Sequence, residues 1–219
     1  MADQNDDDAA AQRFHDAIKD VLGPCDSVFH VPREQQEPGT PHIDVFIYFA
    51  RRIPFHLLVT AGMSSRAQGS PETSTHRPRV ELYAKLPAHL ERPTLVQICR
   101  ALWALAQWPF RGTHPRFLAE WHMVHGLPPI AEGSQLDAFL LTMPLASDRP
   151  MEALGKRLEA QLLHAYGMTD GERRILESLD PTKLPATSLA LMRAAGPFTD
   201  PDRAEIDLLA TFRDSTPLH

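Results

Sequence analysis

Cysteine is scarce in this 219-residue sequence, which contains Cys25 and Cys99 and no CxxC pair. Two cysteines so far apart indicate neither a disulfide framework nor a zinc ribbon. We interpret both as reduced thiols that pack in the interior. The eleven glycines are scattered, and neither GxGxxG nor GxxxxGK[ST] occurs. These loops need closely spaced glycines because backbone amides must approach the phosphates, so a nucleotide enzyme is not expected.

Long apolar runs and an excess of positive charge are also missing. The apolar run LVQICRALWAL is interrupted by Arg100, and the N-terminal MADQNDDDAA is acidic where a secretory signal would be basic. The net charge of −6 at pH 7 disfavours nucleic acid as the main partner. We therefore expect a cytoplasmic protein that binds neither membranes nor nucleic acid and needs no cofactor.

The composition is that of a globular protein, with 43% hydrophobic and 23% charged residues. The length allows one domain with an appendage. We predict a disordered acidic N-terminus over residues 1–12, an α/β domain over 13–180, and a helical C-terminal appendage over 181–219.

The first half of the sequence predicts a helix followed by three strands. An apolar stripe at helical spacing ends at Gly23-Pro24, which should stop the helix. The segments HIDVFIYFA, FHLLVT and RVELYAKL alternate apolar and polar residues or are rich in β-branched and aromatic residues, as strands are. In the third, the alternation places Tyr83 and Lys85 on the outward face. The stretch AQGSPETSTHRP before it has the composition of an exposed loop.

The second half predicts further helices and strands. Apolar residues at helical spacing run from Leu95 to Leu105, and EWHMVH and DAFLLTMPL should be strands. Residues 157–166 fit both a helix and a strand, and we favour the strand. Thr169 and Glu172 have the spacing of a capping box that opens a helix, and two short helices should follow, the second capped by Asp200. The fold class is therefore α/β (α+β), a mixed sheet of about five to seven strands packed by helices.

A glycine and two serines follow the second predicted strand, in TAGMSSR. A serine-hydrolase elbow needs Gly-x-Ser-x-Gly and a helix directly after it, and here Gly62-Met63-Ser64 is followed by Ser65-Arg66 and a loop. The second glycine and the helix are both missing. We therefore favour a structural turn and keep a Ser64 hydrolase as a distant alternative.

A metal site is not expected either. His122 and His125 have a spacing that suits chelation on a helix, but a strand would send their side chains to opposite faces. Asp44, Glu81 and Glu120 are candidate acids, yet nothing in the sequence brings two of them together.

Five segments in order resemble the suppressor-of-fused-like domain family. They are HIDVFIY, LLVTAGMSS, VELYAKLP, WALAQWP and EWHMVHGLPPIAEGSQLDAFLLTMPL. The resemblance places family motif positions on Asp44, Thr60, Gly62, Met63, Ser64, Glu81, Leu82, Leu86, Pro87, Trp108, Pro109 and Gly126.

The sequence departs from the family pattern after the Met-Ser pair, where it continues Ser65, Arg66 and Ala67, and again at Gly167-Met168. These departures put a shared binding surface in doubt but not the fold. The resemblance implies an α/β domain that binds another protein and has no established catalytic centre.

The two-lobed eukaryotic member grips a transcription-factor peptide between its lobes, and this chain is too short for that arrangement. Bacterial single-domain members imply an immunity protein that neutralises a toxin, and a housekeeping interaction domain is the alternative. An acidic surface would speed encounter with a basic toxin. Tyr48, Tyr83 and Trp121 are our candidates for partner contacts because each lies in a predicted strand, although packing within the sheet explains them equally well.

Overall fold

The computed structural model describes residues 2–37, 39–51, 53–69, 79–112, 116–208 and 210. Most of the predicted loop AQGSPETSTHRP and the last nine residues of the predicted appendage lie outside these ranges. Within the described residues, no helix is long and apolar enough to cross a membrane.

Seven strands in the described part of the chain form one mixed sheet in the order β1-β2-β3-β4-β7-β6-β5. All neighbouring strands are antiparallel except β4 and β7, which are parallel. The strands are β1 Ser27–Phe29, β2 Asp44–Tyr48, β3 Phe55–Ala61, β4 Val80–Pro87, β5 Met123–His125, β6 Leu136–Thr142 and β7 Gln161–Thr169. The predicted fold class, an α/β mixed sheet packed by helices, is confirmed.

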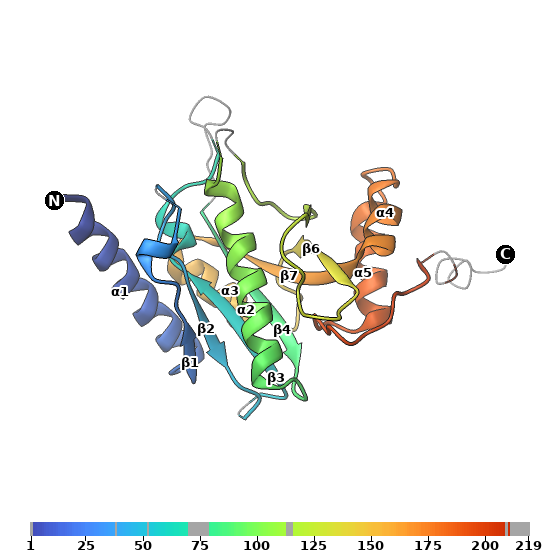
Figure 1. Cartoon of the computed structure of the whole chain (residues 1–219), viewed down its shortest axis with the longest axis horizontal. Helices are drawn as coiled ribbons and strands as arrows, with labels where there is room; N and C mark the ends of the chain where they lie inside the picture. Colours follow the sequence, from blue (N-terminus) through green and yellow to red (C-terminus); the bar gives the residue numbers. More distant parts are fainter. Residues whose placement is uncertain are drawn as a thin grey trace.

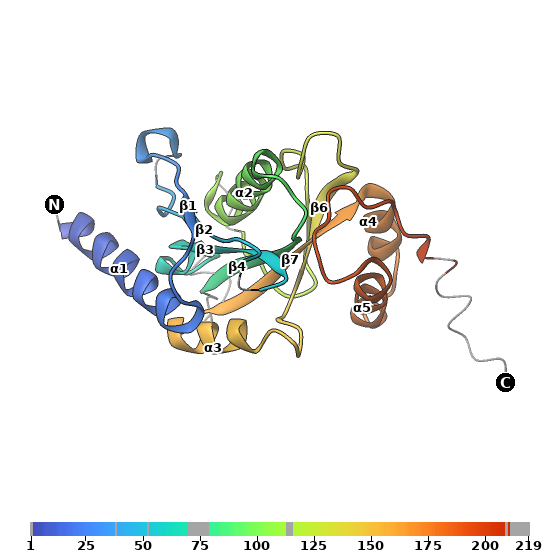
Figure 2. The same cartoon turned by 90° about the horizontal axis from the view of Figure 1, so that it is seen from below.

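Helices cover both faces of this sheet. In the described residues the α-helices are α1 Ala2–Leu22, α2 Arg92–Gln107, α3 Arg149–Leu158, α4 Asp170–Glu177 and α5 Leu184–Ala195, and the short 3-10 helices are η1 Arg33–Gln35, η2 Met63–Ser65 and η3 Trp108–Phe110. Helix α2 lies on one face, whereas α1 and α3 lie on the other (Figures 1 and 2).

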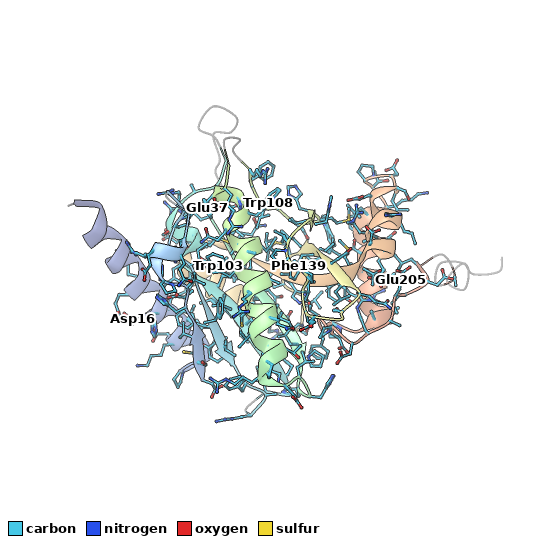
Figure 3. The ribbon with its side chains drawn as sticks, viewed as in Figure 1. Asp16, Glu37, Trp103, Trp108, Phe139 and Glu205 are labelled. Atoms are coloured by element: carbon cyan, nitrogen blue, oxygen red, sulfur yellow. The ribbon has the colours of Figure 1, made fainter. Side chains whose placement is uncertain are left out.

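The main core fills the layer between α2 and the sheet. Leu102 and Leu105 of α2 meet Leu58, Leu82 and Phe139 from three strands. In Figure 3, Trp103 and Phe139 lie near the centre of the molecule, and Asp16 and Glu205 lie toward opposite ends. Burying such side chains fully contributes about 1.5–3 kcal/mol each, so this layer dominates the stability of the fold.

Several sequence predictions agree with the structure and several do not. The first helix ends at Leu22, before Gly23, as predicted, and the capping box of Thr169 and Glu172 is present at the start of α4. The helix predicted to begin after Asp200 begins later, because residues 201–207 form a turn and irregular backbone and helical backbone is found at Leu208 and Ala210. Residues 2–12, predicted to be disordered, form the first turns of α1. Residues 157–166 divide between the end of α3 and the start of β7.

The polar face predicted for β4 is also wrong. Tyr83 is fully buried and Lys85 is 5% exposed, because α1 and α3 cover the side of the sheet that the alternation assigned to solvent. Alternation in a strand distinguishes its two faces but does not show whether a second layer covers the polar one.

The segment after residue 180 packs against the sheet rather than standing apart from it. Leu191 and Met192 of α5, with Leu208, contact Leu140 and Tyr166 on β6 and β7. The contacts therefore continue across the boundary predicted at residue 180.

An ion pair fastens this segment to the sheet. Glu172, fully buried at the start of α4, accepts hydrogen bonds from both terminal nitrogens of Arg203, at 2.6 and 2.7 Å. The Glu172 oxygens also accept hydrogen bonds from the backbone amides of Thr169 and Ile206. Arg203 in addition donates a hydrogen bond to the carbonyl of Gly167. A charge this buried needs such complete pairing, because an unpaired one would be very costly.

Replacing Arg203 by methionine should therefore lower the free energy of unfolding by about 3–5 kcal/mol, since the Glu172 carboxylate would stay buried without its partner. Urea denaturation measures the change. Lys156→Met is the matched control, because the Lys156–Glu152 pair has exposed side chains and should contribute little. Equal small losses in the two variants would contradict this role of Arg203.

Candidate functional site

The sequence motif after β3 forms a hydrogen-bonded turn. The ladder between β3 and β4 ends at the pair Val59–Tyr83, and beyond it the Thr60 hydroxyl accepts the Leu82 amide at 2.7 Å. The same hydroxyl donates to Oε2 of Glu81 at 2.6 Å, and the Ser64 amide donates to Oε1 at 2.6 Å. The Glu81 side chain thus joins β3, β4 and η2.

Gly62 is required by a close backbone contact. Its φ of +112° is one that side-chain-bearing residues rarely adopt, and a Cβ there would lie 2.1 Å from the carbonyl oxygen of His42. The start of β2 can therefore approach the end of β3 only if residue 62 is glycine. Gly126 differs: its φ is +73°, but a Cβ would meet nothing within 4 Å.

Glu81 is fully buried, and burial raises its pKa to about 7. Hydrogen bonds from Thr60 and from the Ser64 amide oppose this effect by stabilising the carboxylate. Sequence reasoning treated Glu81 as one of three candidate acids. In the structure, Glu81 instead links the turn to the two strands through its hydrogen bonds to Thr60 and Ser64.

Other positions of the family motif also lie in the core or at the ends of helices and strands. Met63 and Leu82 are fully buried in the core, and Pro87 is the last residue of β4. Trp108 lies at the junction of α2 and η3, with the Arg116 guanidinium 4.8 Å from its ring. Ser64 is only 4% exposed, which does not suit a nucleophile that must meet a substrate.

The three aromatic residues proposed for partner contacts have different positions. Tyr83 is fully buried beneath α1 and α3 rather than on a free face of the sheet, although its side chain lines the pocket described below. Trp121 is half-buried, but it lies in a turn before β5 with a φ of +66°, not in a strand. Tyr48 lies in β2 as predicted and lines a pocket.

The residues weighed as metal ligands or acids are dispersed. His122 precedes β5 with its ring against Phe117, and His125 is exposed at the end of that strand. Glu120 lies in the adjacent turn. Asp44, by contrast, begins β2 and is close to two histidines that sequence reasoning did not consider.

A pocket of about 170 Å³ opens between the end of α1, strands β2–β4 and the start of α3. Its walls are apolar and include Leu22, Phe49, Ile53, Phe55, Leu57 and Met151. An apolar concavity with a few polar groups at its base is the usual form of a binding site.

The base of the pocket is a buried ion pair. The Lys85 ammonium donates to both carboxylate oxygens of Asp148, at 2.9 and 3.0 Å, and the Tyr83 hydroxyl donates to Oδ2 at 2.8 Å. Burial acts to raise the pKa of Asp148, but the hydrogen bonds from Lys85 and Tyr83 outweigh it and leave that pKa below its ordinary value. Both charges are therefore neutralised within the protein.

His164 lies behind this base, stacked on Tyr83 with ring centroids 4.8 Å apart. Burial lowers its pKa to about 3, and the nearby Lys85 charge acts in the same direction. The imidazole is thus neutral at pH 7. With Lys85 committed to Asp148, the pocket is suited to hold an apolar group rather than to transfer protons.

Sequence reasoning missed this pocket because it missed α3. Asp148 followed by Arg149-Pro150 is a helix-start pattern, with Pro150 in the first turn, and Met151 and Leu154 lie on its buried side. That signal would have identified the helix, but not the pairing of Asp148 with Lys85, 63 residues earlier in the sequence.

The contact at Gly62 predicts unequal effects for two glycine substitutions. Gly62→Ala should lower the free energy of unfolding by more than about 3 kcal/mol, since it adds a backbone clash to an unfavourable φ. Gly126→Ala should cost only about 1 kcal/mol, the cost of the conformation alone. Ser64→Ala should cost less than Gly62→Ala, about 1 kcal/mol, because it removes the side-chain hydrogen bond to Glu81 but retains the Ser64 amide that also binds it. Thermal denaturation compares the three, and equal losses at Gly62 and Gly126 would contradict the clash.

Glu81 predicts a particular dependence of stability on pH. Because its pKa is about 7 in the folded protein and 4.5 as an ordinary side chain, the folded state binds the proton more tightly. This contribution, up to about 3 kcal/mol, is complete below pH 4.5 and is lost as the pH rises through 7.

Glu81→Gln is the matched variant, since it does not titrate. Its amide oxygen can accept from the Ser64 amide, and its nitrogen can donate to the Thr60 hydroxyl, which then donates to the Leu82 carbonyl. The stability of the natural protein relative to Glu81→Gln should therefore fall between pH 5 and pH 8 in urea denaturation. A difference that is constant or grows over that range would show that the carboxylate keeps a low pKa.

Solved structures of other proteins have the same fold as this chain. A SUFU (suppressor of fused protein) homologue from Neisseria gonorrhoeae FA 1090 matches with a TM-score of 0.62 and 17% identity, over 90% of this chain and 96% of the other. A chain of the Sufu–Fu complex matches with a TM-score of 0.58 and 13% identity, over 94% of each chain. At these identities the likeness shows the fold. The curated proteins give no match.

The family comparison extends the agreement to the sequence. The model of the suppressor of fused protein (SUFU) family matches residues 39–204, which include the turn at Gly62, the base of the pocket and the Glu172–Arg203 pair. The chain belongs to the suppressor of fused protein (SUFU) family.

Proposed function

We propose that this chain is a protein-binding domain without catalytic activity, and that its pocket receives an apolar side chain of the partner. The observation that carries the proposal is the apolar pocket over the neutralised Lys85–Asp148 pair. Family membership supports it, because a structure of similar fold is that of a protein in complex with another, Sufu with Fu.

The size of the pocket favours a single anchoring side chain. A volume of about 170 Å³ suits a residue such as leucine or phenylalanine rather than a large cofactor. Interfaces gain much of their affinity where one apolar side chain fills a desolvated pocket. Phe49 and Phe55 would contact such a side chain, while the Lys85 ammonium, 6.0 Å from the Phe55 ring centre, stays with Asp148.

Because helices cover both faces of the sheet, its edges are the parts available for additional contacts with a partner. In the described residues the edge strands are β1 and β5, each three residues long. Strand β1 is the closer to the pocket, because Asp26, just before it, lines the opening. Val28 in the middle of β1 is 39% exposed, so a partner anchored in the pocket would also cover this edge.

We further propose that the partner is a toxin, neutralised in the cytoplasm by occlusion. The net charge of −6 would accelerate encounter with a basic protein, and neutralisation needs only a complementary surface. A housekeeping interaction domain is the alternative. A gene for a large secreted toxin beside this one favours immunity, whereas an operon of metabolic enzymes favours the alternative. The Ser64 hydrolase has little support, given the burial of Ser64.

The test combines affinity capture from the native organism with two matched variants. The captured partner is identified, purified and titrated against the natural protein, Ile53→Trp and Phe117→Ala by calorimetry. Ile53→Trp places a large ring in the pocket opening and should weaken binding at least about tenfold. Phe117 is 49% exposed next to His122, away from the pocket, and Phe117→Ala should bind normally.

The possible failures are distinguishable. A partner that binds Ile53→Trp as tightly as the natural protein would move the interface away from the pocket. Failure to capture any specific partner, together with turnover of an ester or amide substrate that Ser64→Ala abolishes, would refute the binding function itself.

A further inference from the structure

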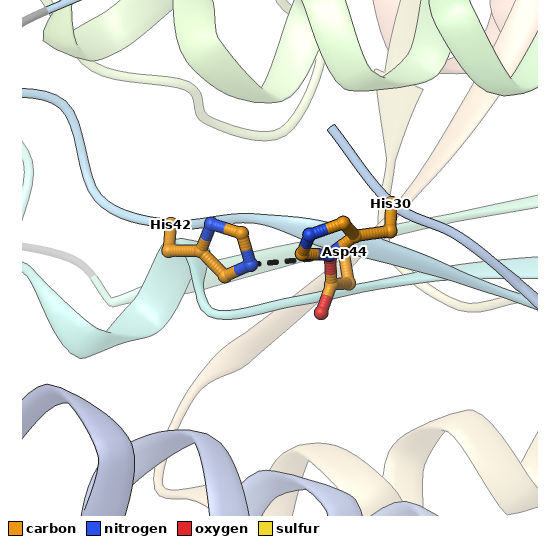
Figure 4. Close-up of side chains that lie close together, drawn as sticks. All are labelled: His30, His42 and Asp44. Carbon is orange, nitrogen blue, oxygen red and sulfur yellow. Dashed lines mark hydrogen bonds and ion pairs between the residues drawn. The ribbon is translucent and has the colours of Figure 1, made fainter. Parts of the chain in front are cut away.

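Two histidines and an aspartate converge where β1 ends and β2 begins. His30 Nδ1 lies 2.8 Å from Oδ1 of Asp44, and His42 Nε2 lies 3.3 Å from the same oxygen. Figure 4 shows both imidazole rings directed at the Asp44 carboxylate. One ligand atom from each residue lies within 4.8 Å of the other two.

The backbone enforces this arrangement. Strands β1 and β2 are antiparallel with Phe29 opposite Val45, so the next residue, His30, comes opposite Asp44. His42 precedes Asp44 by two residues, the spacing that places side chains on the same face of an extended chain. Neighbours across and along a strand thus supply the three side chains.

The segment that carries His42 is held on several sides. The carbonyl of His42 packs against Gly62, the carbonyl of Pro41 accepts from Gln107, and the carbonyl of Ile43 accepts from the Trp103 indole. Ile43 itself is fully buried. The positions of His42 and Asp44 are therefore set by the core, and only His30, with a side chain 55% exposed, is free to adjust.

We propose that His30, His42 and Asp44 bind one divalent transition-metal ion of the zinc class. Two imidazoles and one carboxylate are a common three-ligand set for such ions, and they leave a fourth position for water or for a donor from another molecule. Ligand atoms bound tetrahedrally at about 2.0–2.1 Å are about 3.3 Å apart. The two distances to Asp44 are already close to this value.

The charges also suit a cation. Asp44 supplies a carboxylate oxygen that both imidazoles already approach, at 2.8 and 3.3 Å. Glu34 and Glu37 border the adjoining hollow beside His42, together with Arg33. A divalent ion would take the place of the hydrogen bonds that the imidazoles now make to Asp44.

One proton must move for His42 to bind through Nε2. The Gln36 amide nitrogen lies 2.8 Å from His42 Nδ1 and donates to the Val31 carbonyl at 2.6 Å. In this state Nδ1 accepts and Nε2 carries the proton. On metal binding, His42 loses the Nε2 proton to solvent and takes up one at Nδ1, and the Gln36 amide nitrogen must move away from Nδ1 because both would then be donors. His30 likewise gives up the Nδ1 proton that it donates to Asp44 and carries its proton on Nε2.

A second cluster provides the control. His89, Asp200 and Asp202 also lie close enough to share an ion, but the side chains of His89 and Asp202 are 62% and 75% exposed, and these two residues are 3.7 Å apart. The backbone of the segment from Asp200 to Asp202 is also held, since the Pro201 carbonyl accepts a hydrogen bond from Ser134, so the two clusters differ in the exposure of their side chains. Sequence reasoning weighed only His122 and His125 and predicted no metal, so the site proposed here replaces that expectation.

The experiment is calorimetric titration of the untagged full chain with zinc chloride at pH 7.5. We expect saturable binding of one ion per chain. His30→Ala and Asp44→Asn should each weaken it at least about tenfold, since each removes one ligand. His89→Ala should bind as the natural protein does. His30 is exposed, so its substitution should preserve the fold, and circular dichroism checks this for every variant.

Absence of saturable binding in the natural protein would overturn the proposal. Unchanged affinity in folded His30→Ala and Asp44→Asn would also overturn it, as would loss of binding in His89→Ala alone.

Discussion

The carbonyl oxygen of His42 occupies the place where any residue other than glycine at position 62 would carry a Cβ. This contact sets how the start of β2 meets the end of β3, where Asp44 pairs with Ala61. The register then continues to Tyr48 opposite Leu57, both of which line the pocket. At the other end, the same contact holds the segment that carries His42 and Asp44. One backbone approach thus supports both proposed sites, although neither contains Gly62.

Buried ionisable side chains fasten the peripheral elements to the sheet in a consistent way. Glu81 holds η2, Asp148 joins the start of α3 to Lys85 on β4, and Glu172 joins Arg203 to the β7–α4 junction. Buried ion pairs contribute little net stability compared with apolar packing, but they penalise arrangements that separate the partners. Each pair therefore specifies a position more than it adds free energy. For the pocket, this means a polar base held in one position beneath apolar walls.

The sequence predicted the elements whose periodicity is long and regular. The stripe from Leu95 to Leu105 identified α2, and β-branched and aromatic runs identified β2, β3 and β4. The Thr169–Glu172 spacing identified the start of α4. Short elements escaped: β1 has three residues, and α3 lies next to a strand whose apolar residues also fit a helix. The turn at Gly62 was predicted because turn residues are a local signal, but the close contact of Gly62 with the His42 carbonyl was not.

Contacts between distant residues could not be predicted in the same way. The outward face assigned to Tyr83 and Lys85 is buried because α1 and α3 pack on it, and a single strand carries no information about a second layer. His30 and Asp44 meet through the pairing of β1 with β2, and β1 was not predicted. The pairing of Lys85 with Asp148 likewise depends on tertiary structure. Both candidate sites are built from residues that are distant in the sequence, whereas a local motif identifies only a local feature such as the turn at Gly62.

The most direct test of the binding role is hydrogen–deuterium exchange of the protein alone and in complex with its captured partner. If the pocket is the binding surface, exchange should slow at the end of α1, at the start of β3 and at the start of α3, over residues 22–26, 53–57 and 147–151. The turn at Gly62 should be unaffected, because it is buried in both states. Protection confined to β5 and the end of β6, with these three segments unchanged, would contradict the assignment of the pocket as the site where the partner binds.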